Sequence, residues 1–107
     1  MITILDHLVD AHEMKKYNPD TFDCPSYQEL GDLRPGDYVK VCRYGERFWI
    51  KFETEFHHGL LVGTVANQLL LELNETICLD DTVAVECRHV YAIHPATGPS
   101  NKVVKTT

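Results

Sequence analysis

The sequence lacks any apolar run approaching the roughly 20 residues that a membrane-spanning helix needs. Its N-terminus has no basic opening, and Asp6 interrupts the first apolar stretch too early for a signal peptide. We therefore expect a soluble, cytoplasmic protein without a membrane partner.

Cysteines paired at the spacing of a structural zinc site are also missing, because no Cys-x2-Cys motif occurs. Without secretion, the cysteines are expected to stay reduced and to pack as small apolar groups. We expect no metal and no other cofactor. The alternative is a tetrahedral zinc site. Its candidate ligands are Cys24, Cys42, Cys78, Cys87, His89 and the pair His57-His58.

Patterns that carry nucleophilic catalysis are scarce. The chain's serines are Ser26 and Ser100, neither in a nucleophile-elbow context, and no glycine-rich phosphate loop occurs. Cys24 precedes Pro25 at an expected helix start, where a thiolate is favoured. We expect a non-enzymatic protein, and a small enzyme using Cys24 or a histidine–carboxylate pair is the weakest alternative.

Positive charge is scarce and concentrated in one segment. The formal net charge is −6, but residues 34–51 carry five cations against two carboxylates. The rest of the chain holds five cations against fourteen carboxylates. General nucleic-acid affinity needs a basic surface, so the charge disfavours it while leaving one small anion-facing patch.

The 107 residues fit a single domain with an ordinary globular composition. Residues 1–35 are expected to form a helix and connector that pack on a β-barrel of residues 36–93, and residues 94–107 a flexible tail. The helical spacing of Leu5, Leu8 and His12 predicts a helix that Asn18-Pro19 ends, although residues 2–4 could equally form a short strand. One helical turn is expected around residues 26–30.

A β-hairpin gives the clearest signal. Residues 38–42 alternate apolar and polar side chains, and residues 47–52 alternate again after a short loop with Gly45 at its tip. Further strands are expected at 60–65, 68–73 and 83–87, with a bulge or tight bend at Gly63. Residues 88–93 form either a helical turn or a last strand.

About five short strands separated by turns favour a small, strongly bent barrel. Closing so small a sheet removes its edges and gives it one shared core. The predicted fold is therefore mainly β, an SH3-like barrel first and an oligonucleotide-binding barrel second.

The hairpin belongs to a wider pattern. It runs from Gly36-Asp37-x-Val39-Lys40-Val41 through Gly45-Glu46-Arg47-Phe48-Trp49-Ile50 to Gly63-x-Val65-x-Asn67, Val83-x-Val85 and His89-Val90. This pattern resembles small bacterial β-barrel proteins of unknown function, over residues 36–90. The resemblance implies a bent barrel and no catalytic residues, and its members often look like accessory or immunity-type proteins near mobile elements. The chain departs from it in having Asp80-Asp81 for the family's second Gly-Asp and Ala66-Asn67-Gln68 for its Asp-Asn-x-Pro turn.

The hairpin also supplies the candidate binding residues. Trp49 should point away from the core between Arg47 and Lys51, which combines flat apolar area with charge. Tyr38, Tyr44 and Arg43 extend this candidate face. The N-terminal segment also needs a surface to pack on, so we favour an arrangement in which it covers Trp49 with Leu5, Leu8 or Phe22 over one that leaves Trp49 open.

The leading hypothesis is a non-enzymatic interaction module that binds another protein through the hairpin face or the acidic remainder of its surface. The second is a nucleic-acid-binding or regulatory barrel, in which bases stack on aromatic side chains within a basic groove. The oligomeric state does not follow from the sequence.

Overall fold

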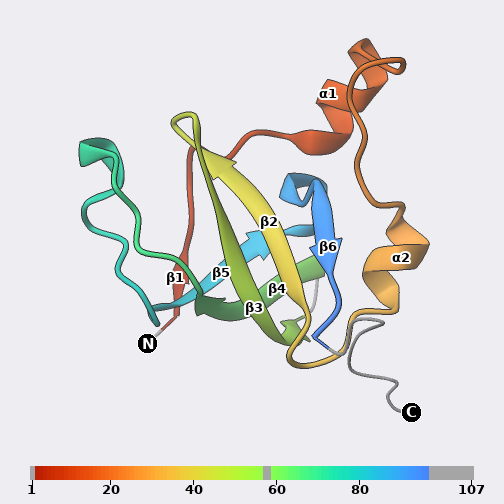
Figure 1. The fold of residues 1–107 in the computed structure, drawn as a ribbon. Coiled ribbons are helices and arrows are strands. Elements are labelled where there is room, and N and C mark those ends of the chain that lie inside the picture. The colour runs from red at the N-terminus through yellow and green to blue at the C-terminus, as the bar shows by residue number, and fades with distance from the viewer. Residues whose placement is uncertain (1, 57–58, 97–107) are drawn as a thin grey trace.

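The structure of the chain is a computed structural model that describes residues 2–56 and 59–96 (Figure 1). Within them the protein is mainly β, with one mixed six-stranded sheet and two short α-helices. The pair His57-His58 and the predicted tail beyond residue 96 lie outside the described residues. No helix in the described ranges is long and apolar enough to cross a bilayer.

The N-terminal segment contains the short strand that was one alternative, but its helix is shorter than predicted. Leu5 and Leu8 lie outside the helix, because their backbones bond to Ala84 and bridge to Arg43 instead. Strand β1 (Thr3–Ile4) comes first, and helix α1 (Ala11–Tyr17) begins only after Asp10, whose carboxylate caps it. Helix α2 (Tyr27–Gly31) begins at Ser26, which forms a capping box. The predicted helical turn at residues 26–30 is therefore confirmed.

The main sheet contains β2 (Tyr38–Arg43), β3 (Glu46–Phe56), β4 (Leu60–Val65), β5 (Thr82–Glu86) and β6 (Ala92–His94). The strand order is β1-β5-β4-β3-β2-β6, and only the β1–β5 pair is parallel. The predicted barrel closure is wrong, because no pairing joins β1 to β6 within the described residues. These edge strands have two and three residues, and short edges limit exposed backbone without closure.

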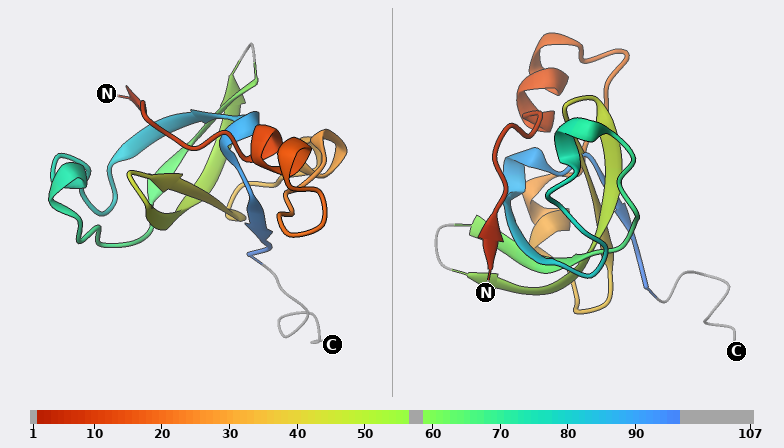
Figure 2. Two further views of the ribbon diagram at one scale, coloured as in Figure 1. Left: turned by 90° about the horizontal axis from the view of Figure 1, so that it is seen from above. Right: turned by 90° about the vertical axis from the view of Figure 1, so that its left-hand side faces the viewer.

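The predicted strand at residues 68–73 is also wrong. Those residues form an irregular loop that ends in the 3₁₀ turn η2 (Glu72–Asn74). The Glu46 carboxylate accepts the backbone N–H groups of Leu70 and Leu71, and thereby replaces a strand ladder as their partner. The loop projects from one side of the sheet and the two α-helices lie on the other (Figures 1 and 2).

The core lies on the inner face of the bent sheet, and the predicted alternation of β2 and β3 is confirmed. Val39, Val41, Phe48 and Ile50 are buried there. A Cβ atom at Gly63 would lie 2.1 Å from the backbone oxygen of Lys51, so only glycine allows β3 and β4 to approach this closely. The register of the pair shifts just beyond this point, between Phe52 and Thr54, as the predicted bulge or bend requires.

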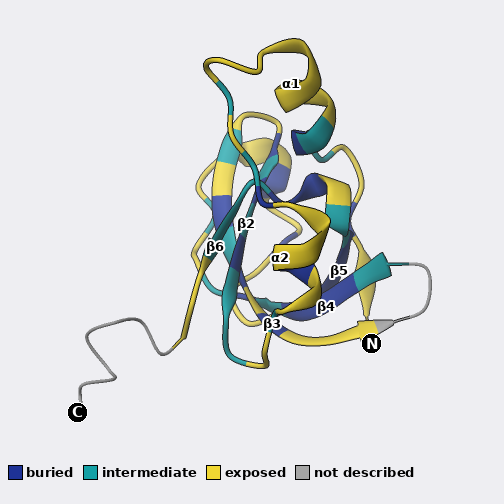
Figure 3. Cartoon of the chain, turned by 90° about the vertical axis from the view of Figure 1, so that its right-hand side faces the viewer, coloured by how far each residue is buried: buried dark blue, intermediate teal, exposed yellow. Residues whose placement is uncertain are grey.

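Residues 87–94 contain both a helical turn and a strand, which were the two alternatives for residues 88–93. The 3₁₀ turn η3 (Cys87–His89) follows β5, and β6 then returns to pair with β2. Helix α1 packs beside η3 and is exposed along most of its length (Figure 3). The N-terminal segment is thereby anchored to the sheet at the η3 end.

Candidate functional site

The outward side of β2, β3 and β6 forms the candidate site, which we call the outer face. It is composed of Tyr38, Lys40, Arg47, Trp49, Lys51 and His94. The strand register sets Lys40 opposite Trp49, Tyr38 opposite Lys51, and His94 beside Tyr38. Because inward and outward side chains alternate, burial of the apolar set on the inner face brings these six together.

Trp49 lies at the centre of this face and is half-buried. The Lys40 Nζ atom lies 5.2 Å from the centroid of the Trp49 ring, within range of a cation–π contact. The His94 ring meets the indole edge to face at 6.2 Å between centroids, and Tyr38 lies 6.5 Å from His94. The three aromatic rings thus contact one another in sequence, and part of the indole stays exposed.

A shallow hollow of about 360 Å³ opens among these rings. Its lining adds Ala66 and Asn67 to Tyr38, Trp49 and His94. The Asn67 side-chain oxygen accepts the Trp49 backbone N–H at 2.7 Å. Its amide nitrogen has no hydrogen-bond partner among the described residues, so it can donate to a bound group.

Among the described residues, the N-terminal segment approaches the outer face near Arg47, where both contact Tyr91. The rings of Phe22 and Tyr91 lie 6.1 Å apart between centroids. The Arg47 Cζ atom lies 5.6 Å from the centroid of the same Tyr91 ring. Burial raises the pKa of Tyr91 to about 12, so its hydroxyl stays protonated.

Leu5 and Leu8 belong to the core cluster and its border. The three residues that were candidates to cover Trp49 therefore pack elsewhere. Trp49 keeps an accessible part of its ring on the outer face.

Charge on the outer face has one sign. Lys40, Arg47 and Lys51 form no ion pair with any described carboxylate, and the outward positions of the paired parts of β2 and β3 carry no acidic residue. Elsewhere in the described ranges, Arg43, Arg88 and Lys15 are each paired with a carboxylate, whereas Lys16 and Arg34 are not. The outer face is therefore a locally cationic surface on a protein with a net charge of −6.

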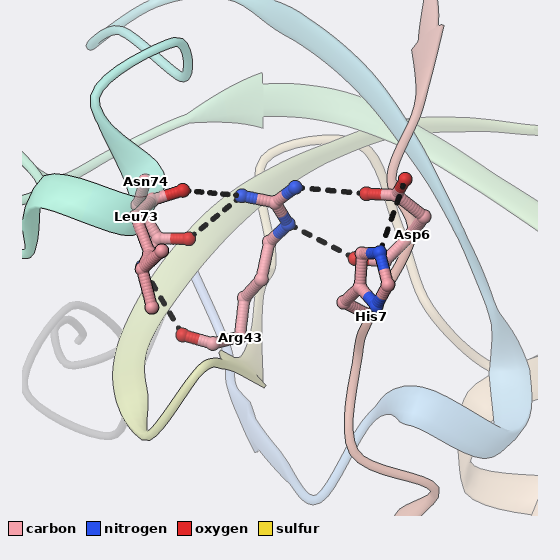
Figure 4. Close-up of polar contacts among 5 residues, drawn as sticks. All are labelled: Asp6, His7, Arg43, Leu73 and Asn74. Atoms are coloured by element: carbon pink, nitrogen blue, oxygen red, sulfur yellow. Dashed lines mark hydrogen bonds and ion pairs between the residues drawn. The ribbon is translucent and has the colours of Figure 1, made fainter.

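Two predicted site residues lie apart from this face. Arg43 is buried on the inner side, where it donates to Asp6, to the Leu73 carbonyl and to the Asn74 side chain (Figure 4). Tyr44 is at the hairpin tip and stacks on His7 at 5.1 Å between ring centroids. The structure thus brings Tyr38, Arg47, Trp49 and Lys51 together and separates Arg43 and Tyr44 from them.

Sequence reasoning missed two members of the outer face, Lys40 and His94, and also Asn67 in the lining of its hollow. Lys40 alternates with Val39 and Val41, so its outward direction was visible in the pattern, although its contact with Trp49 needed the register. His94 comes from a strand whose partner was unknown. Asn67 precedes a segment that was expected to be a strand, and only the turn after β4 places its amide beside Trp49.

The structure gives little support to the two alternative functions, a metal site and catalysis by Cys24. The described part of the chain contains no group of three or more histidine, cysteine or acidic side chains placed to hold a metal. Burial raises the pKa of the Cys24 thiol, which opposes the thiolate that a nucleophile needs.

Comparisons with protein-family models, with curated proteins and with solved structures found no match to this chain. The resemblance suggested by the hairpin pattern therefore stays a prediction.

Proposed function

We propose that this protein is a non-catalytic interaction module whose outer face binds an acidic segment of a protein partner. The observation that carries the proposal is the group of unpaired cations around a half-buried tryptophan. Tryptophan and arginine supply much of the binding energy in protein interfaces, because they combine large contact area with directed polar groups.

The charge distribution supports a protein partner of defined orientation. The cationic face attracts a carboxylate-rich segment, and the acidic remainder of the surface repels the same segment from other sites. Charge complementarity of this kind fixes the docking register and speeds association. An apolar side chain of the partner would fill the hollow beside Trp49.

We propose a non-catalytic role because the Cys24 thiol, the candidate nucleophile, is poorly placed to ionise. Burial raises the pKa of Cys24 and outweighs the opposing effect of Lys15, which is paired with Asp23. A thiol in that setting stays protonated at neutral pH.

Single-stranded nucleic acid is a second candidate ligand, favoured by the hollow itself. A base can stack on Trp49 or Tyr38, the Asn67 amide nitrogen can donate to a base edge, and Lys40 lies within reach of a phosphate. The net charge of −6 opposes this ligand at long range, so we rank it below an acidic protein segment.

Two finer assignments belong to the same proposal. Strands β2 to β5 form a meander, and β6 returns to β2 after the 3₁₀ turn η3, an order that supports an SH3-like architecture. We also infer a cytoplasmic location, on which the reduced state of the cysteines depends.

Affinity capture with outer-face variants tests the proposal. The immobilised protein is incubated with a lysate of the cells that produce it, as wild type, Trp49→Ala, Lys51→Glu and Lys16→Glu. Lys16 lies on exposed helix α1, so its substitution gives a matched charge reversal away from the face.

We expect a specific protein to be captured by wild type and Lys16→Glu and lost from both outer-face variants, with circular dichroism unchanged. Capture that survives both outer-face substitutions would refute the proposal. Retention of single-stranded DNA on a filter at low salt, abolished by the same substitutions, would instead establish the second candidate.

A further inference from the structure

The loop that replaces the predicted strand at residues 68–73 exposes a cluster of leucines. Leu70 is 86% exposed and Leu73 is 63% exposed, while Leu71 is 39% exposed between them. Leu69 is partly buried against the core and anchors the start of the loop. We call residues 69–75 the leucine loop. Clustered exposed apolar side chains of this kind mark interaction sites more often than isolated ones do.

The exposure is built into the fold, because polar groups hold the loop backbone in place. The Glu46 carboxylate accepts the N–H groups of Leu70 and Leu71 at 2.6 and 3.0 Å, and the Asn74 side-chain N–H at 2.9 Å. Beneath them, the buried Arg43 donates to the Leu73 carbonyl at 3.2 Å (Figure 4). These bonds fix the backbone with the leucine side chains turned outward.

Charge around the leucine loop identifies what it can bind. Residues 52–87 contain no lysine or arginine and carry seven carboxylates, of which Glu72 and Glu75 belong to the loop. An anionic lipid surface would repel such a loop. Two copies of the loop would likewise repel each other, which opposes a symmetric loop-to-loop dimer.

The outer face has the complementary properties. It is cationic where the loop is acidic, and its hollow beside Trp49 has the aromatic lining that a leucine side chain would fill. The two surfaces do not satisfy each other within one chain, because Leu70 remains 86% exposed. The partner that carries both of these complementary surfaces is a second copy of this protein.

We propose that the protein associates head to tail, with the leucine loop of one copy docked on the outer face of the next. This inference rests on the proposed function, since it names an acidic, apolar segment that the outer face binds. A heterologous contact of this kind gives closed rings where its rotation closes and open chains where it does not.

Sedimentation velocity of the full-length chain tests the proposal, from about 1 µM to about 500 µM protein, a range that spans weak to moderate affinities. The variants are Leu70→Asp in the loop and Lys51→Glu on the face. Their matched controls on helix α1 are Tyr17→Asp and Lys16→Glu, which make the same charge changes at exposed positions.

We expect concentration-dependent association of the wild type that weakens as salt rises from about 50 mM to about 500 mM, because screening reduces the charge attraction. Each loop or face variant should weaken self-association by about tenfold or more, while both controls behave as wild type. An equimolar mixture of Leu70→Asp and Lys51→Glu should form a 1:1 complex, because each variant keeps the surface that the other lacks.

A monomeric wild type, or association that neither variant weakens, would overturn the inference. Failure of the mixture to form a complex would overturn the head-to-tail arrangement even if the wild type associates. A monomeric wild type that still captures an acidic partner in a Lys51-dependent manner would leave the proposed function standing, so the two failures are distinguishable.

Discussion

Arg43 and Asp6 are 37 positions apart in the sequence, yet the Arg43 guanidinium donates to both the carboxylate and the backbone carbonyl of Asp6, at 2.8 and 2.9 Å. The same guanidinium donates to the Asn74 side chain at 2.8 Å. One buried cation therefore joins the N-terminal segment, the β2–β3 hairpin and the leucine loop (Figure 4). The hydrogen bond from Arg43 also lowers the pKa of Asp6.

Replacing Arg43 should destabilise the protein more than replacing a face cation. Arg43→Met leaves the buried Asn74 side chain and the Leu73 carbonyl without their donor, at an expected cost of about 3 kcal/mol of unfolding free energy. Arg47→Met, at an exposed position, should cost about 0.5 kcal/mol or less. Urea unfolding measures both, and equal losses would contradict the role given to Arg43.

Glu46 should control the order of the leucine loop. Hydrogen bonds from Leu70 and Asn74 lower the pKa of Glu46, so the ordered loop is favoured at pH values above the carboxyl's ordinary pKa of 4.5. That contribution is lost as the pH falls through the lower folded-state pKa. Glu46→Gln should speed amide hydrogen exchange at Leu70 and Leu71 by about tenfold at neutral pH.

The matched control for Glu46 is Glu53→Gln, a substitution of an exposed glutamate on β3. It should leave the exchange of both leucine amides unchanged. Wild-type protection in Glu46→Gln would show that the loop is held by something other than this carboxylate.

His89 should make stability depend on pH near neutrality. Its side chain is buried and Nδ1 accepts the Glu86 backbone N–H at 3.3 Å. Burial lowers the pKa of His89 below 6.5, so folding favours the neutral ring. The stabilisation is full above pH 6.5 and is lost as the pH falls from there toward the folded-state pKa, because the unfolded chain then binds an extra proton.

Urea unfolding between pH 7.5 and pH 5.5 tests this linkage, a range that brackets the ordinary histidine pKa of about 6.5. His89→Asn retains a hydrogen-bond acceptor but cannot be protonated there, so its stability should fall less over this range than that of the wild type. Parallel pH profiles for the two proteins would rule out the contribution of His89.

Gly63 should be intolerant of any side chain. Gly63→Ala places a Cβ atom against the Lys51 backbone oxygen and forces β3 and β4 apart, at an expected cost of about 3 kcal/mol. Gly31→Ala has no atom within 4 Å of the new Cβ and serves as the control. Thermal unfolding should show a large loss for the first and little change for the second, and similar melting temperatures would contradict the close approach.

The sequence predicted the parts of the fold that depend on local patterns. Alternation in residues 38–42 and 47–52 predicted which side chains face the core, and Gly45 marked the hairpin turn, where its φ is +83°. The outward cluster of Trp49 with its flanking cations followed from the same alternation.

Features of the fold that depend on long-range polar contacts could not be predicted from these local patterns. Three consecutive leucines at residues 69–71 favour a strand, and only a carboxylate from β3, more than twenty residues away, turns them into a loop. Arg43 was expected on the binding face because it is basic, but its partners from two distant segments keep it inside. Barrel closure likewise depends on edge strands whose lengths the pattern did not specify.

Trp49 occupies an accessible surface surrounded by unpaired cations, and quenching of its fluorescence tests this arrangement most directly. Trp49 is the chain's single tryptophan, so its emission reports on the outer face alone. At constant low ionic strength, the ratio of iodide to caesium quenching should be higher for Trp49 than for a free tryptophan amide in the same buffer, because Lys40, Arg47 and Lys51 attract the anion. Lys51→Glu should reduce that ratio. A ratio equal to or below that of the free tryptophan amide, or an indole inaccessible to both ions, would contradict a cationic, accessible outer face.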